Sequence, residues 1–446
     1  MTDHLIFLSI PGLRPRDVTP QTTPTLYQWA NRGVLAELTP TFPCVTSPVQ
    51  TTMWTGIPPD RHGVIANGFF HRDRREVAFW TAHHDVIEGE PVWDAIRTRR
   101  SRLTSAVWHA QNIKGASADF IVTPAPIHEP DGGVRLWCYS KPEGLYQNLL
   151  DALGHFPLQH YWGPLTGIES TRWILDGACW LIDRYAPNFH WIYIPHLDYA
   201  AQKFGPDSPQ AQASLVELDE QLARLADHVA RSPIDDSVVY VAAGEYALTD
   251  VTGVVYPNRM LHEAGLLTVR EVDGREQIDL EKSAAFAMVD HQFSHIYLNN
   301  RADSRRRAQV CALFEQTAGI AGVYAGDDRK KIGLDHPRSG EIILVTQPDH
   351  WLAYYWWFDD AAAPAFARTV DIHRKPGYDP VELFFNPATR EIPLNATLVK
   401  GSHGAPAVEA RQQTALICSS PACDIRPGQP YQDVDLNRIA LDLMSR

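Results

Sequence analysis

Short apolar runs recur along the chain, and each is followed by a polar segment that contains glycine or proline. The clearest runs are Leu5–Ile10, Phe189–Ile194 and Ser237–Ala243. Continuous apolar runs of this length are typical of parallel strands that are buried on both faces. Longer amphipathic segments, such as Ser170–Ala186 and Leu215–Arg231, have the spacing of helices that cover such a sheet. The pattern therefore predicts an α/β fold, doubly wound around a mostly parallel central sheet.

The segment 265–398 predicts a smaller α+β lobe that is inserted into this fold. Its expected elements are a strand, a helix with Ser304 as its N-cap, and two further strands. In order, they lie within Ser283–Asn299, Ser304–Thr317, Gly319–Tyr324 and Gly340–Val345. The core would then comprise 1–264 and 399–446, and it would end in a helix at Asp433–Met444.

Composition narrows the possible functions. With 53 acidic and 40 basic residues the net charge is −13, which argues against a surface that coats nucleic acid. The sequence has no run of eighteen apolar residues, so we expect no membrane span. The six cysteines are dispersed and the N-terminus lacks a signal-peptide pattern, which predicts a reduced, cytoplasmic chain. A disulfide between Cys418 and Cys423 remains an alternative.

One stretch, Thr39–Asn67, has the features of a turn that presents a hydroxyl at the start of a short helix. Thr46 and Ser47 are N-cap residue types, Pro48 suits a first helical turn, and a glycine follows the expected end. A hydroxyl there faces unpaired backbone N–H groups and the positive end of the helix dipole. Such a place suits a phosphoryl oxygen or a nucleophile. The alternative is that Thr46 only caps the helix.

The same stretch resembles the nucleophile segment of the nucleotide pyrophosphatase/phosphodiesterase family, within the alkaline phosphatase superfamily. The shared residues keep their spacing over nearly thirty positions: Thr41, Phe42, Pro43, Thr46, Pro48, Thr55, Gly56, Pro59, His62, Gly63 and Asn67. The resemblance gives Thr46 the position of the nucleophile and Asn67 a substrate-binding position. One departure is Val49-Gln50, where the family has Asn-His. We expect Gln50 to replace that asparagine as a donor to a phosphate oxygen.

The resemblance also implies a metal site, and three of its ligand positions keep suitable side chains. Asp198 follows the run Phe189–Ile194 and matches a family aspartate. His403 lies in Gly-Ser-His-Gly and matches the closing metal histidine. Glu245 takes the place of a second aspartate and is one methylene longer. We expect it to serve as the ligand or the base beside Thr46.

Three other positions of the family site are changed. Pro11 stands where the family has an acid, and Gln202 and Tyr246 stand where it has histidines. The amide oxygen of Gln202 is a weaker zinc ligand than imidazole and favours harder ions. A tyrosine is a poor ligand unless it is ionised. The resemblance thus implies zinc, and the altered ligands allow manganese or magnesium.

The loop 369–379 carries candidates for the missing ligands. Asp371 and His373 offer a carboxylate and an imidazole, and Arg374 offers a cation for the substrate. Asp290, His291 and His295 are further candidates. The alternative for them is a structural role, because a histidine beside an aspartate on a strand is more often a hydrogen-bonded core pair than a metal ligand. The alternative for the loop is a surface turn.

Together these features predict a metal-dependent hydrolase of a phosphodiester or pyrophosphate bond. The expected substrate is a nucleotide or another small phosphorylated metabolite, and the expected intermediate is a phospho-threonine at Thr46. The metal ligands would come from Asp198, Gln202, Glu245, His403, Asp371 and His373. The alternative is a ligand-binding relative that keeps the fold and has lost the chemistry.

Overall fold

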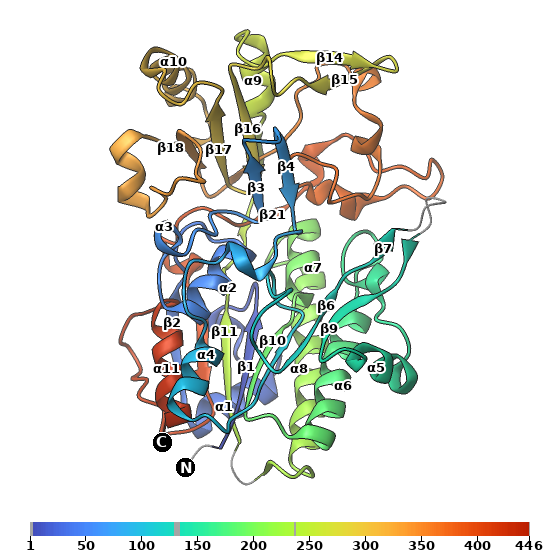
Figure 1. The fold of residues 1–446 in the computed structure, drawn as a ribbon, viewed down its shortest axis with the longest axis vertical. Helices are drawn as coiled ribbons and strands as arrows, with labels where there is room; N and C mark the ends of the chain where they lie inside the picture. Colours follow the sequence, from blue (N-terminus) through green and yellow to red (C-terminus); the bar gives the residue numbers. More distant parts are fainter. Residues whose placement is uncertain (1–2, 129–133, 236–237, 446) are drawn as a thin grey trace.

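A nine-stranded sheet forms the centre of the computed structural model, which describes residues 3–128, 134–235 and 238–445 (Figure 1). In spatial order its strands are β23 (Tyr431–Gln432), β2 (Val34–Thr39), β22 (Thr414–Cys418), β11 (Val238–Gly244), β1 (His4–Ile10), β10 (Phe189–Tyr193), β5 (Ser105–Trp108), β6 (Phe120–Pro124) and β9 (Cys138–Lys141). Strands β11, β1, β10, β5 and β6 are parallel neighbours. Strands β22 and β9 run antiparallel to their neighbours. The predicted mostly parallel α/β fold is confirmed.

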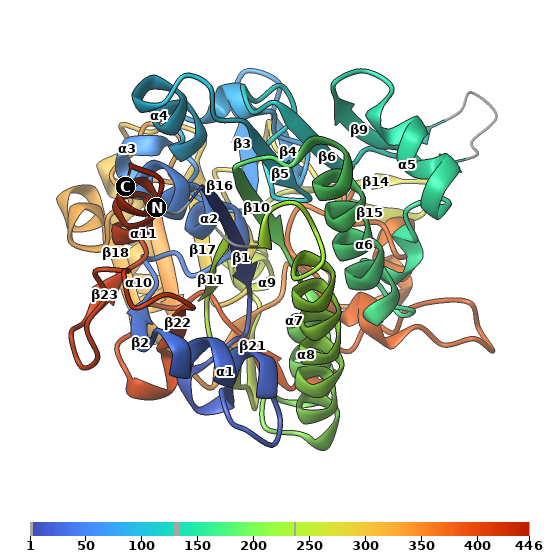
Figure 2. The ribbon, with the colours of Figure 1, turned by 90° about the horizontal axis from the view of Figure 1, so that it is seen from below.

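Helices cover both faces of this sheet, as Figure 2 shows from below. One face packs against α2 (Thr46–Thr55), α4 (Val92–Arg99) and α11 (Asp435–Ser445). The other packs against α1 (Pro24–Arg32), α5 (Leu145–Leu153), α6 (Ile168–Tyr185) and α8 (Pro209–Val229). Alternate residues of β1 enter the two cores, because successive side chains of a strand point to opposite faces. This explains why the strands are continuous apolar runs.

A second, antiparallel sheet lies at the end of the molecule away from the two termini (Figure 1). Its order is β16 (Ala285–Asp290), β17 (Phe293–Leu298), β19 (Ile342–Thr346) and β18 (Ile320–Ala325). The helices α9 (Pro257–Glu263) and α10 (Ser304–Glu315) pack against it. The sheet falls within the segment expected to form the inserted lobe, and the exact domain boundaries stay a prediction.

Two local predictions in this lobe are wrong. The run Ser283–Asn299 forms a hairpin of two strands, whose turn is at His291 and Gln292. The N-cap of α10 is Asp303, whose side chain accepts a hydrogen bond from the backbone N–H of Arg306. Ser304 is therefore the first helical residue and not the cap.

The remaining described elements are short. Apart from short 3-10 helices, the remaining described helices are α3 (Pro59–His62) and α7 (His196–Phe204). The strand pairs are β3 (Gly68–His71) with β4 (Glu76–Phe79), β7 (Ile127–His128) with β8 (Val134–Arg135), β12 (Thr249–Asp250) with β21 (Gly401–Ser402), β13 (Gly253–Val255) with β20 (His350–Leu352), and β14 (Val269–Val272) with β15 (Arg275–Ile278). Cys418 and Cys423 are thiols, so the alternative of a disulfide between them is wrong. Within the described ranges, no helix has both the length and the apolarity that crossing a bilayer requires.

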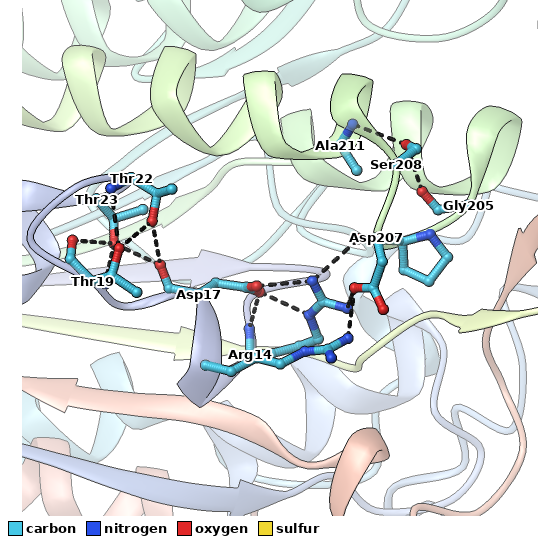
Figure 3. A network of polar contacts seen from close by, with 11 residues as sticks. Arg14, Asp17, Thr19, Thr22, Thr23, Gly205, Asp207, Ser208 and Ala211 are labelled. Atoms are coloured by element: carbon cyan, nitrogen blue, oxygen red, sulfur yellow. Dashed lines mark hydrogen bonds and ion pairs between the residues drawn. The ribbon is translucent and has the colours of Figure 1, made fainter.

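The loop after β1 is fixed by a buried arginine (Figure 3). The Arg14 guanidinium donates to both carboxylate oxygens of Asp17, at 2.8 and 2.9 Å, and to Asp207 at 2.8 Å. Asp207 lies between α7 and α8, and the neighbouring Ser208 caps α8 by accepting from the N–H of Ala211. The network therefore ties the loop that begins at Pro11 to the connection between these two helices.

Candidate active site

The carboxyl ends of the central strands bring the predicted site residues to one edge of the sheet. Pro11 directly follows β1, Glu245 and Tyr246 directly follow β11, and α7 begins shortly after β10. Asp198 and Gln202 lie four residues apart on α7, which places them on the same helix face. In open α/β sheets, ligands bind at this edge.

Thr46 is the first residue of α2, not its N-cap, so that part of the prediction is wrong. The cap position is Val45, whose side chain makes no capping hydrogen bond. Thr46 is 4% exposed, and its hydroxyl lies 3.0 Å from the hydroxyl of Tyr246. The N–H of Ser47 is bound from outside the helix by Asn67 Oδ1 at 2.9 Å. The hydroxyl therefore faces the edge of the sheet, not its own helix.

Tyr246 connects Thr46 to Asp198. Its hydroxyl donates to Asp198 Oδ2 at 3.4 Å and can accept from Thr46. Its ring stacks on the imidazole of His403, with centroids 3.6 Å apart and an interplanar angle of 6°. Burial raises the pKa of Tyr246 well above its usual value, so the phenol is neutral.

Asp198 and His403 present two buried acceptor atoms to each other. His403 Nδ1 lies 2.8 Å from the carbonyl oxygen of Cys44 and must carry the proton, which leaves a lone pair on Nε2. Nε2 lies 3.8 Å from Asp198 Oδ1, and neither atom has a hydrogen-bond partner among the described residues. Burial raises the pKa of Asp198 to about 7, although Gln202 and Tyr246 lower it in part. Two facing lone pairs require a proton or a cation between them.

Glu245 is buried completely and is bound on one oxygen only. Its Oε1 accepts from Ser9 Oγ at 2.7 Å and from Gln50 Nε2 at 2.8 Å. Its Oε2 is buried without a partner in the described part of the chain. Burial raises the pKa of Glu245 to about 8. The Gln50 carbonyl accepts from the N–H of Gln111, so both ends of the amide expected to bind phosphate are engaged within the protein.

Asn67 joins the helix that carries Thr46 to the second sheet. Asp290 accepts from the backbone N–H of Asn67 at 2.8 Å and from its Nδ2 at 3.1 Å. Asp290 also lies 2.6 Å from His291 Nδ1, which makes the hydrogen-bonded pair that the sequence left as an alternative. His291 has a φ of 61°, and its ring lies 3.9 Å from the His403 ring. The turn of the β16–β17 hairpin therefore packs directly against the site.

His295 does not share this position. Its Nε2 faces the carbonyl oxygen of Ile65 at 3.1 Å, and its Nδ1 accepts from the N–H of Gly340. Both ring nitrogens thus hold backbone groups, as in a core histidine.

The loop 369–379 reaches the site through Tyr378. The Tyr378 hydroxyl donates to Gln202 Oε1 at 2.6 Å, and its ring stacks on His291 with centroids 3.6 Å apart. This contact was not anticipated, because an aromatic residue in a loop has no signal that distinguishes it from core. Lys375 anchors the loop in a buried pair of contacts, 2.9 Å from Asp379 and 2.6 Å from Glu382.

Asp371, His373 and Arg374, the three residues predicted from this loop, make other contacts. Asp371 receives Arg374 at 3.8 Å, and its backbone N–H donates to Glu382. His373 Nδ1 lies 3.3 Å from the carbonyl oxygen of Phe79. Across the described ranges, no group of three or more His, Cys, Asp or Glu side chains is placed to hold one metal ion. The predicted ligands Asp198, Gln202, Glu245, His403, Asp371 and His373 therefore do not gather into a single centre.

A smaller ligand set fits one divalent ion. Asp198 Oδ1 and His403 Nε2 are unpartnered and face each other, and the Gln202 amide lies beside Asp198. Catalytic zinc sites usually take three protein ligands and leave further positions for water or substrate. The carboxylate and the imidazole supply two ligands, and the Gln202 oxygen, which already accepts from Tyr378, is the weakest candidate for the third.

A surface groove of about 500 Å³ lies between α6 and α8. Its lining includes the ion pairs Arg224–Asp176 and His228–Asp183. None of the residues around Thr46 lines it, and Arg224 and His228 each pair with an aspartate of the same groove. We therefore place the candidate site at the sheet edge.

The comparison with protein families matches residues 5–379 to the type I phosphodiesterase/nucleotide pyrophosphatase family. Among curated proteins, an uncharacterized pyrophosphatase/phosphodiesterase of Schizosaccharomyces pombe is 22% identical over 320 residues, covering 67% of this chain and 55% of the relative. Ectonucleotide pyrophosphatase/phosphodiesterase family member 7 of Mus musculus is 22% identical over 250 residues, covering 55% and 50%. The matched segments thus span about half the length of these relatives.

Solved structures with the same fold cover nearly the whole chain. Phosphonoacetate hydrolase from Sinorhizobium meliloti, in complex with phosphonoformate, has a TM-score of 0.65 at 14% identity and covers 99% of this chain and 96% of that one. Murine ectonucleotide pyrophosphatase/phosphodiesterase 5, an inactive variant in complex with AMP, has a TM-score of 0.62 at 14% identity and covers 100% and 95%. At this identity the likeness shows the fold alone.

Proposed function

The chain belongs to the type I phosphodiesterase/nucleotide pyrophosphatase family, and we propose that it hydrolyses a phosphodiester or pyrophosphate bond in a small phosphorylated substrate. The observation that carries the proposal is the buried Thr46 hydroxyl at the start of α2. It is held by Tyr246, which in turn reaches the Asp198 carboxylate. A hydroxyl that is oriented by neighbouring polar groups at a helix N-terminus suits nucleophilic attack on phosphorus. The related structures contain AMP and phosphonoformate, small ligands that carry a phosphate or phosphonate group, which supports a small phosphorus-containing ligand for this chain.

The proposed reaction has two steps. The Thr46 oxygen forms a bond to phosphorus while the bond from phosphorus to the leaving oxygen breaks, and the leaving group departs with a proton equivalent to the one that Thr46 loses. Water then attacks the same phosphorus, the bond to Thr46 breaks, and the hydroxyl is restored. One water is consumed for each bond cleaved.

The residues around Thr46 have separate proposed roles. Tyr246 fixes the direction of the Thr46 hydroxyl, and Glu245 carries a proton, because its pKa of about 8 allows both protonation states near neutral pH. A divalent ion at Asp198, His403 and Gln202, when bound, would supply Lewis acidity toward the nucleophile and the phosphate charge. Zinc, manganese and magnesium are the candidates.

Replacing Thr46 tests the proposal. We expect Thr46→Ala to lower kcat/KM for bis-p-nitrophenyl phosphate by about 10³-fold or more, because removing a nucleophile removes the covalent route. Thr46→Ser should keep part of the activity. Thr55→Ala, on the last turn of the same helix, is the control and should stay near wild type.

The alternative from the sequence is a relative that binds ligand without turnover. Calorimetry with AMP on the same preparations separates the two. Binding of AMP with no hydrolysis of any phosphodiester, in wild type and Thr46→Ala alike, would replace the proposed activity by ligand binding.

A further inference from the structure

The side of Thr46 that faces β1 and β11 is filled by hydrogen-bonded neutral groups. Ser9 and Gln50 both donate to the same carboxylate oxygen of Glu245. Pro11, the next residue after β1, has no side-chain atom that can bind a cation. Glu245 therefore lacks a companion ligand from β1, and one of its oxygens already holds two donors.

The Tyr246 phenol occupies the remaining place between the nucleophile and the acid. Its oxygen lies 3.0 Å from Thr46 Oγ1 and 3.4 Å from Asp198 Oδ2. A cation bound to Thr46 and Asp198 would compete with the Tyr246 hydroxyl for both oxygens. The stacking on His403 holds the phenol ring in that position.

Asp198 and His403, by contrast, leave a place for a cation. Asp198 Oδ1 and His403 Nε2 face each other at 3.8 Å without a hydrogen-bond partner among the described residues, and the neighbouring Gln202 amide favours the charged form of Asp198. The described residues thus offer one pair of facing unpartnered atoms, at Asp198 and His403, and one lone carboxylate, Glu245, whose Oε1 already holds two donors and whose Oε2 has no companion ligand from β1.

We infer that this chain binds a single divalent ion, at Asp198 and His403, and that the Tyr246 hydroxyl takes the place of a second ion at Thr46. The inference rests on the proposed function, because it assigns Tyr246 as the positioning residue of the proposed nucleophile. It also predicts a property that does not depend on turnover, namely one bound ion per chain.

Metal content gives the first test. The full chain is stripped with a chelator, reloaded with Zn²⁺ or Mn²⁺, and its bound metal is counted by mass spectrometry and by titration calorimetry. We expect one ion per wild-type chain and none for His403→Ala. The double variant Pro11→Asp with Tyr246→His adds a carboxylate and an imidazole beside Glu245, and it should bind a second ion. Zero or two ions per wild-type chain would overturn the inference.

The second test separates the hydroxyl from the ring. Tyr246→Phe keeps the stacking on His403 and removes the contact with Thr46. We expect it to bind one ion like wild type, with kcat lowered about 10²-fold and KM changed little, as for loss of one oriented polar group. Tyr199→Phe is the matched control, since that buried phenol donates to the carbonyl of Tyr161 and does not contact Thr46.

An unchanged kcat in Tyr246→Phe would overturn the role of the hydroxyl. A wild-type chain that binds one ion and has no activity would instead contradict the proposed function, while the metal count would still support the single-ion site. The two failures are therefore distinguishable.

Discussion

At the scale of single residues, burial controls the charge of the site. Asp198 and Glu245 are carboxyl groups that are buried with too few donors, and the pKa of each is raised, to about 7 and about 8. A buried carboxylate without a cation favours its neutral form. The metal-free protein should therefore hold protons at the site that a bound cation would displace.

This gives a pH dependence of stability with a definite sign. The pKa of Glu245 is higher in the folded chain than in the unfolded chain, so the folded state binds more protons between these two values. The free energy of unfolding should then fall as pH rises, by roughly 2 kcal/mol between pH 6 and 8 from this group. Denaturant unfolding of metal-free wild type and Glu245→Gln measures it.

Glu245→Gln should lose the share of this fall that Glu245 contributes, because it has no titrating group at that position. An equally steep fall in the variant would show that another group is responsible. Asp198, Asp290 and Asp433, whose pKa values burial raises to about 7, act in the same direction below that pH and should account for the dependence that remains.

Part of this site could be predicted from the sequence. The resemblance to the family indicated Thr46, Asp198, Glu245 and His403, and the structure places these residues at one sheet edge. Sequence reasoning could not find that Tyr246 bonds to Thr46 or that Tyr378 reaches Gln202, because both contacts join segments far apart in the chain. The capping prediction for Thr46 was wrong for a related reason: its hydroxyl bonds to a distant side chain.

At the scale of elements, the apolar runs predicted the central strands because a strand buried on both faces leaves no polar positions. The hairpin of β16 and β17 was missed since its turn is only two residues long. The polar pair Asp290-His291 within a run longer than a usual strand was the available signal. That turn packs against the site, so its residues meet a tertiary contact that the local sequence pattern does not indicate.

The loop after β1 provides a prediction at this scale. Arg14→Met leaves Asp17 buried without its cation, and we expect a loss of about 3 kcal/mol in the free energy of unfolding. Arg16→Ala removes the exposed contact to Asp207 and should cost about 0.5 kcal/mol or less. Denaturant unfolding of both variants checks the difference. Equal effects would show that the Arg14 network does not hold the loop.

At the scale of the whole molecule, the second sheet and the core share the site. Asp290 holds Asn67, and Asn67 holds the N–H of Ser47 beside the proposed nucleophile. The carbonyl of His403 accepts from Gln292, and Gly404 (φ 115°) lies so close that a Cβ there would approach His291 Cβ at 3.3 Å. The hairpin turn therefore fixes both α2 and the His403 segment.

Removing this link should affect stability and activity together. Asp290→Ala leaves the donors of Asn67 and His291 buried without an acceptor, which should cost about 2–3 kcal/mol in unfolding free energy and lower kcat. Asp335→Ala breaks a partly exposed pair with Arg329 in the same lobe and should cost about 1 kcal/mol or less. If Asp290→Ala lost stability and kept wild-type kcat, the link would be structural only.

The central claim is that Thr46 attacks phosphorus. The most direct measurement is acid quenching of the enzyme during turnover of bis-p-nitrophenyl phosphate, followed by mass spectrometry of its peptides. The account predicts a p-nitrophenyl phosphoryl adduct on Thr46 that is absent from Thr46→Ala. An adduct on another residue, or undiminished turnover by Thr46→Ala, would contradict it.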